Sequence, residues 1–129
     1  MSLNQLVIDF LAERCIAYRE VEFGVTFKYN DLDYLFVNDD NDEQYFRLVI
    51  PYIHDFPRES RERLVVYNAM NTVNSAFKVV KAYVDEGTVN VAFEILADST
   101  PVVEDIMPRA LGLLHRARKA FYHSLDEQL

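Results

Sequence analysis

Cysteine and tryptophan are scarce in this sequence, with Cys15 alone and no Trp among 129 residues. A single cysteine forms no internal disulfide and matches no paired-cysteine metal spacing, so we expect a reducing compartment, with the cytoplasm as the default. Apolar runs are also short, well below the roughly eighteen residues that span a bilayer. The amino terminus lacks the basic stretch and the cleavage site of a signal peptide. We therefore expect no membrane-spanning segment and no signal peptide.

Basic residues are outnumbered, with 13 Lys and Arg against 21 Asp and Glu and a net charge of −8. This negative field repels nucleic-acid phosphates and anionic membranes, so neither is expected as a partner. Apolar residues make up 50% of the chain, including eight Tyr and nine Phe, which is typical of a globular protein. We predict a single domain over residues 1–129.

Signatures of chemistry are missing as well. His54, His115 and His123 are too scattered for a local metal motif, and Cys15 has no histidine near it to act as a base. The acidic run 38–43 lacks the Gly and the Glu that an EF-hand loop requires, so a solvated turn is the better interpretation. We expect no catalytic residue, no metal ligand and no cofactor, and therefore a protein that is not an enzyme.

Three helices are predicted from apolar residues that recur every three or four positions. The first follows Ser2 as its N-cap, carries Leu3 to Leu11 and ends near Arg14. The second opens with the charged run 58–63 and ends at Asn74. The third begins at Pro101, after Thr100 as its cap, and runs to about residue 125, with an expected kink at Pro108.

Alternating apolar and polar residues predict five strands. Their expected ranges are 21–29, 32–37, 45–50, 77–84 and 89–95. Asn30 and Asp31 give the first reversal, Pro51 ends the third strand, and Asp85-Glu86-Gly87 gives the last turn. The predicted fold class is α+β, in the order α-β-β-β-α-β-β-α, with one antiparallel five-stranded sheet covered mainly on one face.

Two features indicate where a partner would bind. Asparagines on the second helix leave its apolar stripe, and the stripe on the third helix is wide enough for contact on two sides. One side covers the sheet, while the other covers either the first helix or a second copy of the chain. The candidate partner-binding residues are Tyr67, Asn68, Asn71, Asn74, Met107, Leu111 and Leu114.

The segment VYNAMNTVNSAFKVVKAYVDEGTVNVAFEIL, at residues 66–96, resembles the YbjN-like group of bacterial proteins. The similarity rests on Asn68 and Asn71 followed by a strand, the 85–87 turn and a returning strand. Met70 stands where the family often has a tryptophan. The group is described as candidate sensory transduction regulators and is assigned to the type III secretion chaperone-like fold.

This resemblance implies a small cytoplasmic protein that forms a homodimer and binds a segment of another protein, without catalytic residues. We therefore expect a non-enzymatic interaction or chaperone-like module. The alternative is a sensor or regulatory domain that binds a small ligand between sheet and helices, using Tyr and Asn side chains as polar handles.

Overall fold

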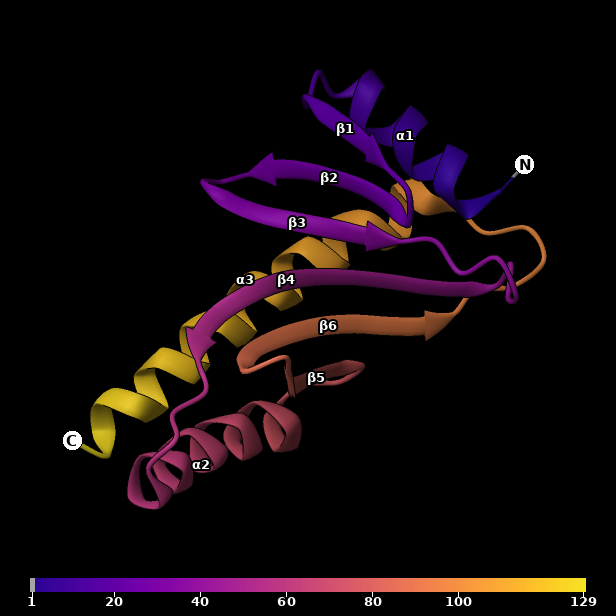
Figure 1. The fold of residues 1–129 in the computed structure, drawn as a ribbon. Helices are drawn as coiled ribbons and strands as arrows, with labels where there is room; N and C mark the ends of the chain where they lie inside the picture. Colours follow the sequence, from indigo (N-terminus) through magenta and orange to yellow (C-terminus); the bar gives the residue numbers. More distant parts are fainter. Residues whose placement is uncertain (1) are drawn as a thin grey trace.

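A computed structural model describes residues 2–129. Within this range the chain forms three helices and six strands (Figure 1). In chain order they are α1 (Leu3–Glu13), β1 (Tyr18–Val21), β2 (Gly24–Tyr29), β3 (Leu32–Val37), β4 (Tyr45–Asp55), α2 (Ser60–Ala76), β5 (Val80–Asp85), β6 (Thr88–Leu96) and α3 (Val103–Glu127). The predicted class is confirmed, but the predicted number of strands is wrong.

All strands pair antiparallel in one sheet, in the order β1-β2-β3-β4-β6-β5 (Figure 1). The extra strand is β1, which precedes the segment predicted as one strand over 21–29 and shares only Val21 with it. There the chain reverses between Val21 and Gly24, which are register partners. The apolar alternation continues through this short turn, so the pattern alone shows no break.

Gly24 allows this reversal to lie close against β3. Its φ is +154°, and a Cβ atom built on it would lie 1.8 Å from the carbonyl oxygen of Phe36. No side chain fits there, so the position requires glycine.

The two predicted hairpin turns are confirmed. Asn30 and Asp31 both have positive φ, at 50° and 63°, between β2 and β3. Glu86 and Gly87 do the same between β5 and β6, at 49° and 77°. Paired positive φ values are those of the type I′ turn, whose twist matches that of the flanking strands.

Strand β4 continues past Pro51, where the sequence predicted its end. The register against β6 shifts between Ile50 and His54, and Tyr52 takes a positive φ of 55° in this bulge. Proline is tolerated because the bulge removes the need for its missing N–H. The backbone N–H of Tyr52 donates instead to Oδ1 of the buried Asn90, at 2.8 Å.

The core lies between the sheet and the helices. Ser2 caps α1 as predicted, since its Oγ accepts from the backbone N–H of Gln5 at 3.1 Å. Helix α1 packs against β1, β2 and β3, whereas α3 crosses β4, β5 and β6 (Figure 1). The largest fully buried side chains are Tyr34, Phe36, Phe46, Phe121, Leu11, Leu48, Met107 and Leu114.

Helix α3 begins at Val103 rather than Pro101. Its N-cap is Val102 and not Thr100, whose backbone N–H donates to the Asp98 carboxylate in a local turn at 2.7 Å. Pro108 lies inside the helix without interrupting it. The wide apolar stripe of α3 contacts the sheet, α1 and α2, so its second side meets helices of the same chain.

Candidate binding groove

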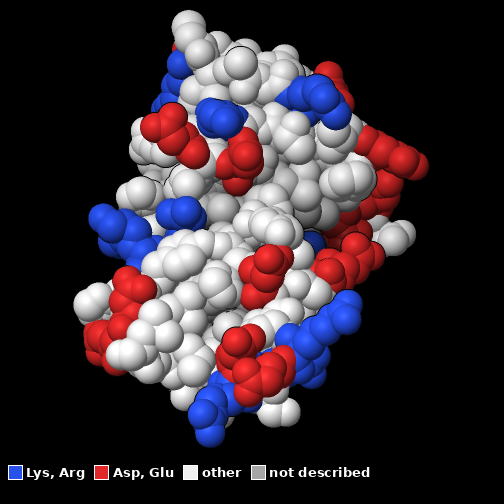
Figure 2. Space-filling view, turned by 60° about the vertical axis from the view of Figure 1, so that its left-hand side comes forward, with Lys and Arg blue, Asp and Glu red and all other residues white. Residues whose placement is uncertain are grey.

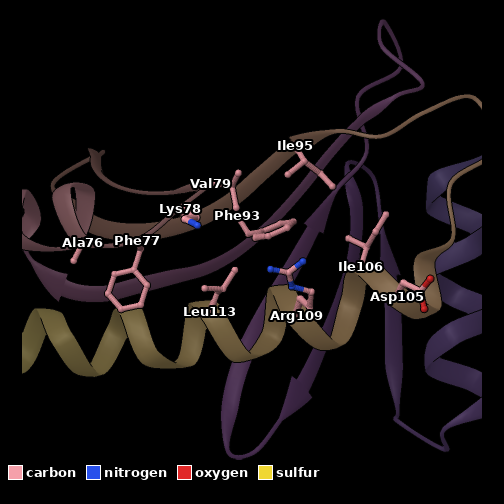
Figure 3. Close-up of a pocket in the computed structure, with 10 residues that line it drawn as sticks. All are labelled: Ala76, Phe77, Lys78, Val79, Phe93, Ile95, Asp105, Ile106, Arg109 and Leu113. Carbon is pink, nitrogen blue, oxygen red and sulfur yellow. The ribbon is translucent and has the colours of Figure 1, made fainter.

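An open groove of about 580 Å³ lies between α3, strand β6 and the segment that joins α2 to β5 (Figure 3). Its lining residues are Ala76, Phe77, Lys78, Val79, Phe93, Ile95, Asp105, Ile106, Arg109 and Leu113. Helix α3 contributes residues on successive turns, because positions three or four apart lie on one helix face. The groove is therefore assembled from three segments distant in sequence.

The groove exists because β5 begins late. The sequence predicted a strand from Phe77, but Val79 takes a positive φ of 54° and the strand starts at Val80. The backbone N–H of Glu94 donates to the carbonyl of Val79 at 3.0 Å, the last bond of this pairing. Beyond it, Ile95 pairs with β4 alone, which leaves its β5 side uncovered.

The surface of the groove is mainly apolar. Phe93 is buried at its floor, Ile95, Ile106 and Leu113 are half-buried, and Val79 is 49% exposed. In Figure 3, Ile106 and Leu113 point from α3 toward the sheet. Half-buried aliphatic groups surround the hollow. When another apolar group displaces the water there, the free energy of the system falls.

Two cations and one anion lie among these apolar groups. In Figure 3 the Arg109 guanidinium points toward Phe93, while the Asp105 carboxylate lies at the far end of the groove and points away. Neither Arg109 nor Lys78 forms a salt bridge with any of residues 2–129. On the face of the molecule in Figure 2, acidic and basic side chains are interspersed, and several of opposite sign lie side by side.

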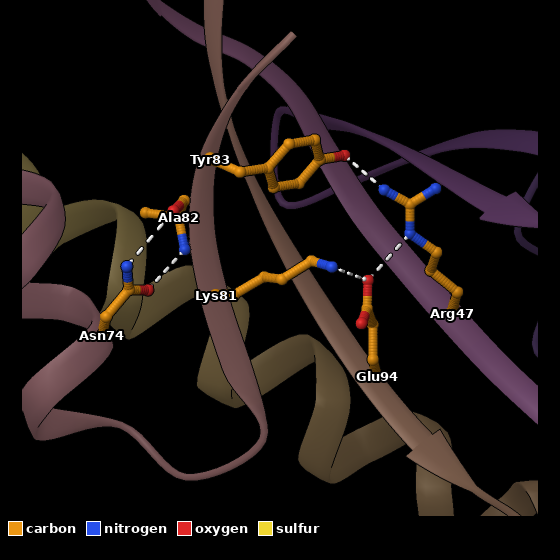
Figure 4. Close-up of polar contacts among 6 residues, drawn as sticks. All are labelled: Arg47, Asn74, Lys81, Ala82, Tyr83 and Glu94. Atoms are coloured by element: carbon orange, nitrogen blue, oxygen red, sulfur yellow. Dashed lines mark hydrogen bonds and ion pairs between the residues drawn. The ribbon is translucent and has the colours of Figure 1, made fainter.

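The opposite face of β6 carries a charged cluster (Figure 4). Glu94 accepts from Nε of Arg47 at 3.0 Å and from Nζ of Lys81 at 2.9 Å. Arg47 also donates to the hydroxyl of Tyr83 at 2.6 Å. These contacts tie β4, β5 and β6 together, so the strands behind the groove are held in a defined arrangement.

Electrostatics within this cluster shifts two pKa values. Burial raises the pKa of Glu94, but hydrogen bonds from Lys81 and Tyr45 together with the charges of Lys81 and Arg47 outweigh it, and the net pKa lies below its ordinary value. Burial and the neighbouring Glu94 raise the pKa of Tyr45 to about 12. Glu94 is therefore ionised and Tyr45 protonated at neutral pH.

The polar candidates on α2 lie apart from the groove, and two of them make bonds within the chain. Asn68 donates to the side chain of Gln128 at 3.1 Å. Asn74 donates to the carbonyl of Ala82 at 3.2 Å and accepts from its N–H at 2.7 Å. Tyr67 is 52% exposed with its ring edge against Phe56, whereas Asn71 is exposed and makes no side-chain hydrogen bond within residues 2–129.

The apolar candidates on α3 are inside the chain. Met107, Leu111 and Leu114 are all buried in the core, so a partner reaches them only if α3 moves. The half-buried residues beside them, Ile106 and Leu113, line the groove instead. The signal for this was present in the width of the stripe, but the position of β6 decided which residues stayed accessible.

Other chemistry-bearing residues form no cluster. Within residues 2–129, no group of three or more His, Cys, Asp or Glu side chains is placed to hold a metal ion. Cys15 is exposed at the end of α1. The ring of His54 packs edge-on against Phe121 and Tyr122. Over the same residues, no helix combines the length and apolar character needed to cross a membrane.

Together these features define an α+β protein with one antiparallel sheet and an apolar groove between that sheet and its longest helix. No protein-family model and no curated protein sequence matches the chain. Among solved structures, the fold is similar to that of YbjN from E. coli, described as a candidate transcription regulator. That match has a TM-score of 0.64 and 13% identity over 97% of this chain and 93% of YbjN.

An uncharacterized protein from Methanothermobacter thermautotrophicus is similar too. Its TM-score is 0.67, at 12% identity, and 97% of each chain is covered. The chain therefore has a YbjN-like fold, in agreement with the resemblance carried by residues 66–96. Because both identities are low, the likeness concerns the arrangement of the backbone and leaves function to be argued from this chain's own residues.

Proposed function

We propose that this protein is a non-enzymatic interaction module that binds an apolar segment of another protein in the groove between α3 and β6. The observation that carries the proposal is the open apolar surface formed by Ile95, Ile106 and Leu113 around the buried Phe93. A chaperone-like role, expected from the resemblance, is one form of this activity. It requires a client segment in extended conformation, which supplies side chains on one side at every second residue.

The size of the groove predicts a modest affinity. Two or three aliphatic side chains fit a volume of about 580 Å³, and each contributes roughly 1.5–3 kcal/mol when fully buried. Association costs several kcal/mol in lost freedom, so the net affinity corresponds to a transient complex. Such binding is suited to a partner that must later be released.

A site-specific crosslinker tests this proposal in living cells. Benzoylphenylalanine at the exposed Val79 lies beside the groove, and the same group at the exposed Phe23, in the β1–β2 turn, serves as the control. We expect the Val79 position to capture a discrete protein that the Phe23 position does not. Leu113→Ser should abolish that capture while leaving the circular dichroism spectrum unchanged. Equal capture at both positions would contradict the proposal.

Homodimerisation is the second part of the proposal, and its support is the outer face of α2. Leu64 is 59% exposed there, one turn from the exposed Tyr67. Burying two such residues across a twofold axis brings the same pair from each copy together. Light scattering after size exclusion should give twice the monomer mass. The double variant Leu64→Asp, Tyr67→Asp should have the mass of a monomer.

The alternative is a small-ligand sensor, favoured by one observation. The groove volume falls within the range of about 300–1,000 Å³ that small-molecule sites occupy. A thermal-shift screen distinguishes the two functions, because a ligand that binds only the folded state raises the melting temperature. A compound that does so in the parent protein but not in Leu113→Ser would favour the sensor.

A further inference from the structure

We propose that the segment bound in the groove is both apolar and acidic, and that Arg109 and Lys78 bind its carboxylates. The inference rests on the proposed function and specifies its partner. It assigns a recognition role to two cations that have no salt-bridge partner among residues 2–129.

Arg109 is the main element of this recognition. It extends from α3 toward Phe93, between the positions of Ile106 and Leu113 (Figure 3). Because the surrounding walls are apolar, a bound segment would exclude water from the guanidinium and strengthen its attraction for a carboxylate. An apolar side chain seated on Leu113 would place the residue two positions along an extended segment, which lies on the same face, within reach of this cation.

Lys78 extends the positive character to the opposite wall. It precedes Val79 in the segment that bends away before β5, so it faces the groove from the sheet side while Arg109 faces it from the helix (Figure 3). Asp105 is at the far end and points away from Arg109. Cations on two walls favour acidic residues at more than one inner-facing position over a single carboxylate at one end.

The open form of the groove favours a peptide segment over a small amphiphile such as a fatty acid. Small-ligand sites bury about 70–90% of their ligand. Here Val79 remains half-exposed and the groove is open to solvent, so an acyl chain would keep much of its surface in water. A segment of a longer chain needs to bury only the side chains on its inner face.

Short fluorescein-labelled peptides test the inference by fluorescence anisotropy. In each peptide every second residue is serine, and the positions between, which share one face of an extended chain, alternate leucine with aspartate in the first, leucine with lysine in the second and serine with aspartate in the third. Dodecanoate is the small-amphiphile probe. The net charge of −8 by itself favours the lysine peptide, so a preference for aspartate must come from local groups.

The decisive variant is Arg109→Glu with Lys78→Glu. Its matched control is Arg61→Glu with Lys119→Glu, which changes the net charge equally at exposed positions outside the groove. The parent protein and the control should bind the leucine–aspartate peptide about tenfold or more tightly than the leucine–lysine peptide, the scale of one charge-assisted hydrogen bond. The groove variant should reverse this preference, and the serine–aspartate peptide should bind none of the proteins.

The remaining outcomes overturn the inference in distinguishable ways. Equal binding of both leucine peptides, lost in Leu113→Ser, rejects the acidic specificity and leaves the interaction module intact. Binding of dodecanoate without any peptide rejects the interaction module and selects the sensor. Equal loss in the groove variant and the control shows a long-range charge effect and rejects the role of Arg109 and Lys78.

Discussion

The side-chain amide of Asn74 pairs with both backbone polar groups of Ala82, as a neighbouring strand would. Its Nδ2 donates to the Ala82 carbonyl at 3.2 Å, and its Oδ1 accepts from the Ala82 N–H at 2.7 Å (Figure 4). Ala82 lies on β5, the last strand of the sheet, so these groups have no strand beside them. One residue of α2 thus satisfies the sheet edge at Ala82, where it would otherwise be open to another chain.

Replacing Asn74 should therefore affect both stability and self-association. Asn74→Leu leaves the N–H and C=O of Ala82 without partners, and we expect the free energy of unfolding to fall by about 1–3 kcal/mol. We also expect concentration-dependent association through β5. Asn71→Leu is the control, because Asn71 is exposed on the same helix without a side-chain hydrogen bond in residues 2–129. Urea unfolding and light scattering check both effects, and equal behaviour of the two variants would refute them.

The bulge in β4 depends on Asn90. Its side chain is 6% exposed, accepts from the Tyr52 N–H and donates to the Thr88 carbonyl at 3.2 Å. Asn90→Ala should lower the free energy of unfolding by about 1–3 kcal/mol, because the Tyr52 amide loses its hydrogen-bond partner. Hydrogen exchange gives a local readout, because the Tyr52 amide should lose protection more than those in β2 and β3. Unchanged protection at Tyr52 would show that the bulge is held by other contacts.

The charged cluster on β6 predicts a pH-dependent stability. The folded-state pKa of Glu94 is lowered, so its contribution is present above the unfolded value of about 4 and disappears as the pH falls through the folded value. Glu94→Gln should lower the free energy of unfolding by about 1–2 kcal/mol at pH 7. The difference from the parent protein should shrink as the pH falls. Glu43→Gln, at an exposed position, is the control. A difference between Glu94→Gln and the parent that stays constant from pH 7 to pH 3 would argue against the ion-pair role.

Two glycine substitutions should have opposite effects. Gly24→Ala places a methyl group against the Phe36 carbonyl at 1.8 Å, so β2 and β3 must separate, and we expect a loss of about 3 kcal/mol or more. Gly112→Ala lies inside α3, where its Cβ meets only the mobile end of Arg116 at 3.3 Å. Gly112→Ala should raise the free energy of unfolding by about 0.5–1 kcal/mol, because alanine has the higher helix propensity. Thermal unfolding measures both, and a stable Gly24→Ala variant would contradict the close approach.

Local sequence signals predicted the elements that depend on neighbouring residues. The Ser2 cap, the two hairpin turns and the apolar stripe of α2 each depend on residues within a few positions of one another. Their geometry follows from backbone preference and helix periodicity, so they are recognisable without the rest of the fold.

Where the sequence prediction failed, distant partners decided the outcome. The pattern over 21–29 hid the turn before Gly24 because alternation survives a two-residue reversal. Pro51 ends no strand because Asn90, far along the chain, supplies the hydrogen-bond acceptor for the Tyr52 amide of the bulge. On α2, Asn68 and Asn74 leave the apolar stripe, and only the tertiary structure shows that they bond to Gln128 and Ala82 within the chain.

By itself, the sequence determined the α+β class, most of the elements and the apolar face of each helix, since these follow from short-range periodicity. Only the tertiary structure decided that Met107, Leu111 and Leu114 are enclosed while Ile106, Arg109 and Leu113 border a groove. The physical reason is that a helix stripe specifies which residues leave water but not which neighbour covers them. At this groove the cover depends on where β5 begins, and the positive φ of Val79 sets that point.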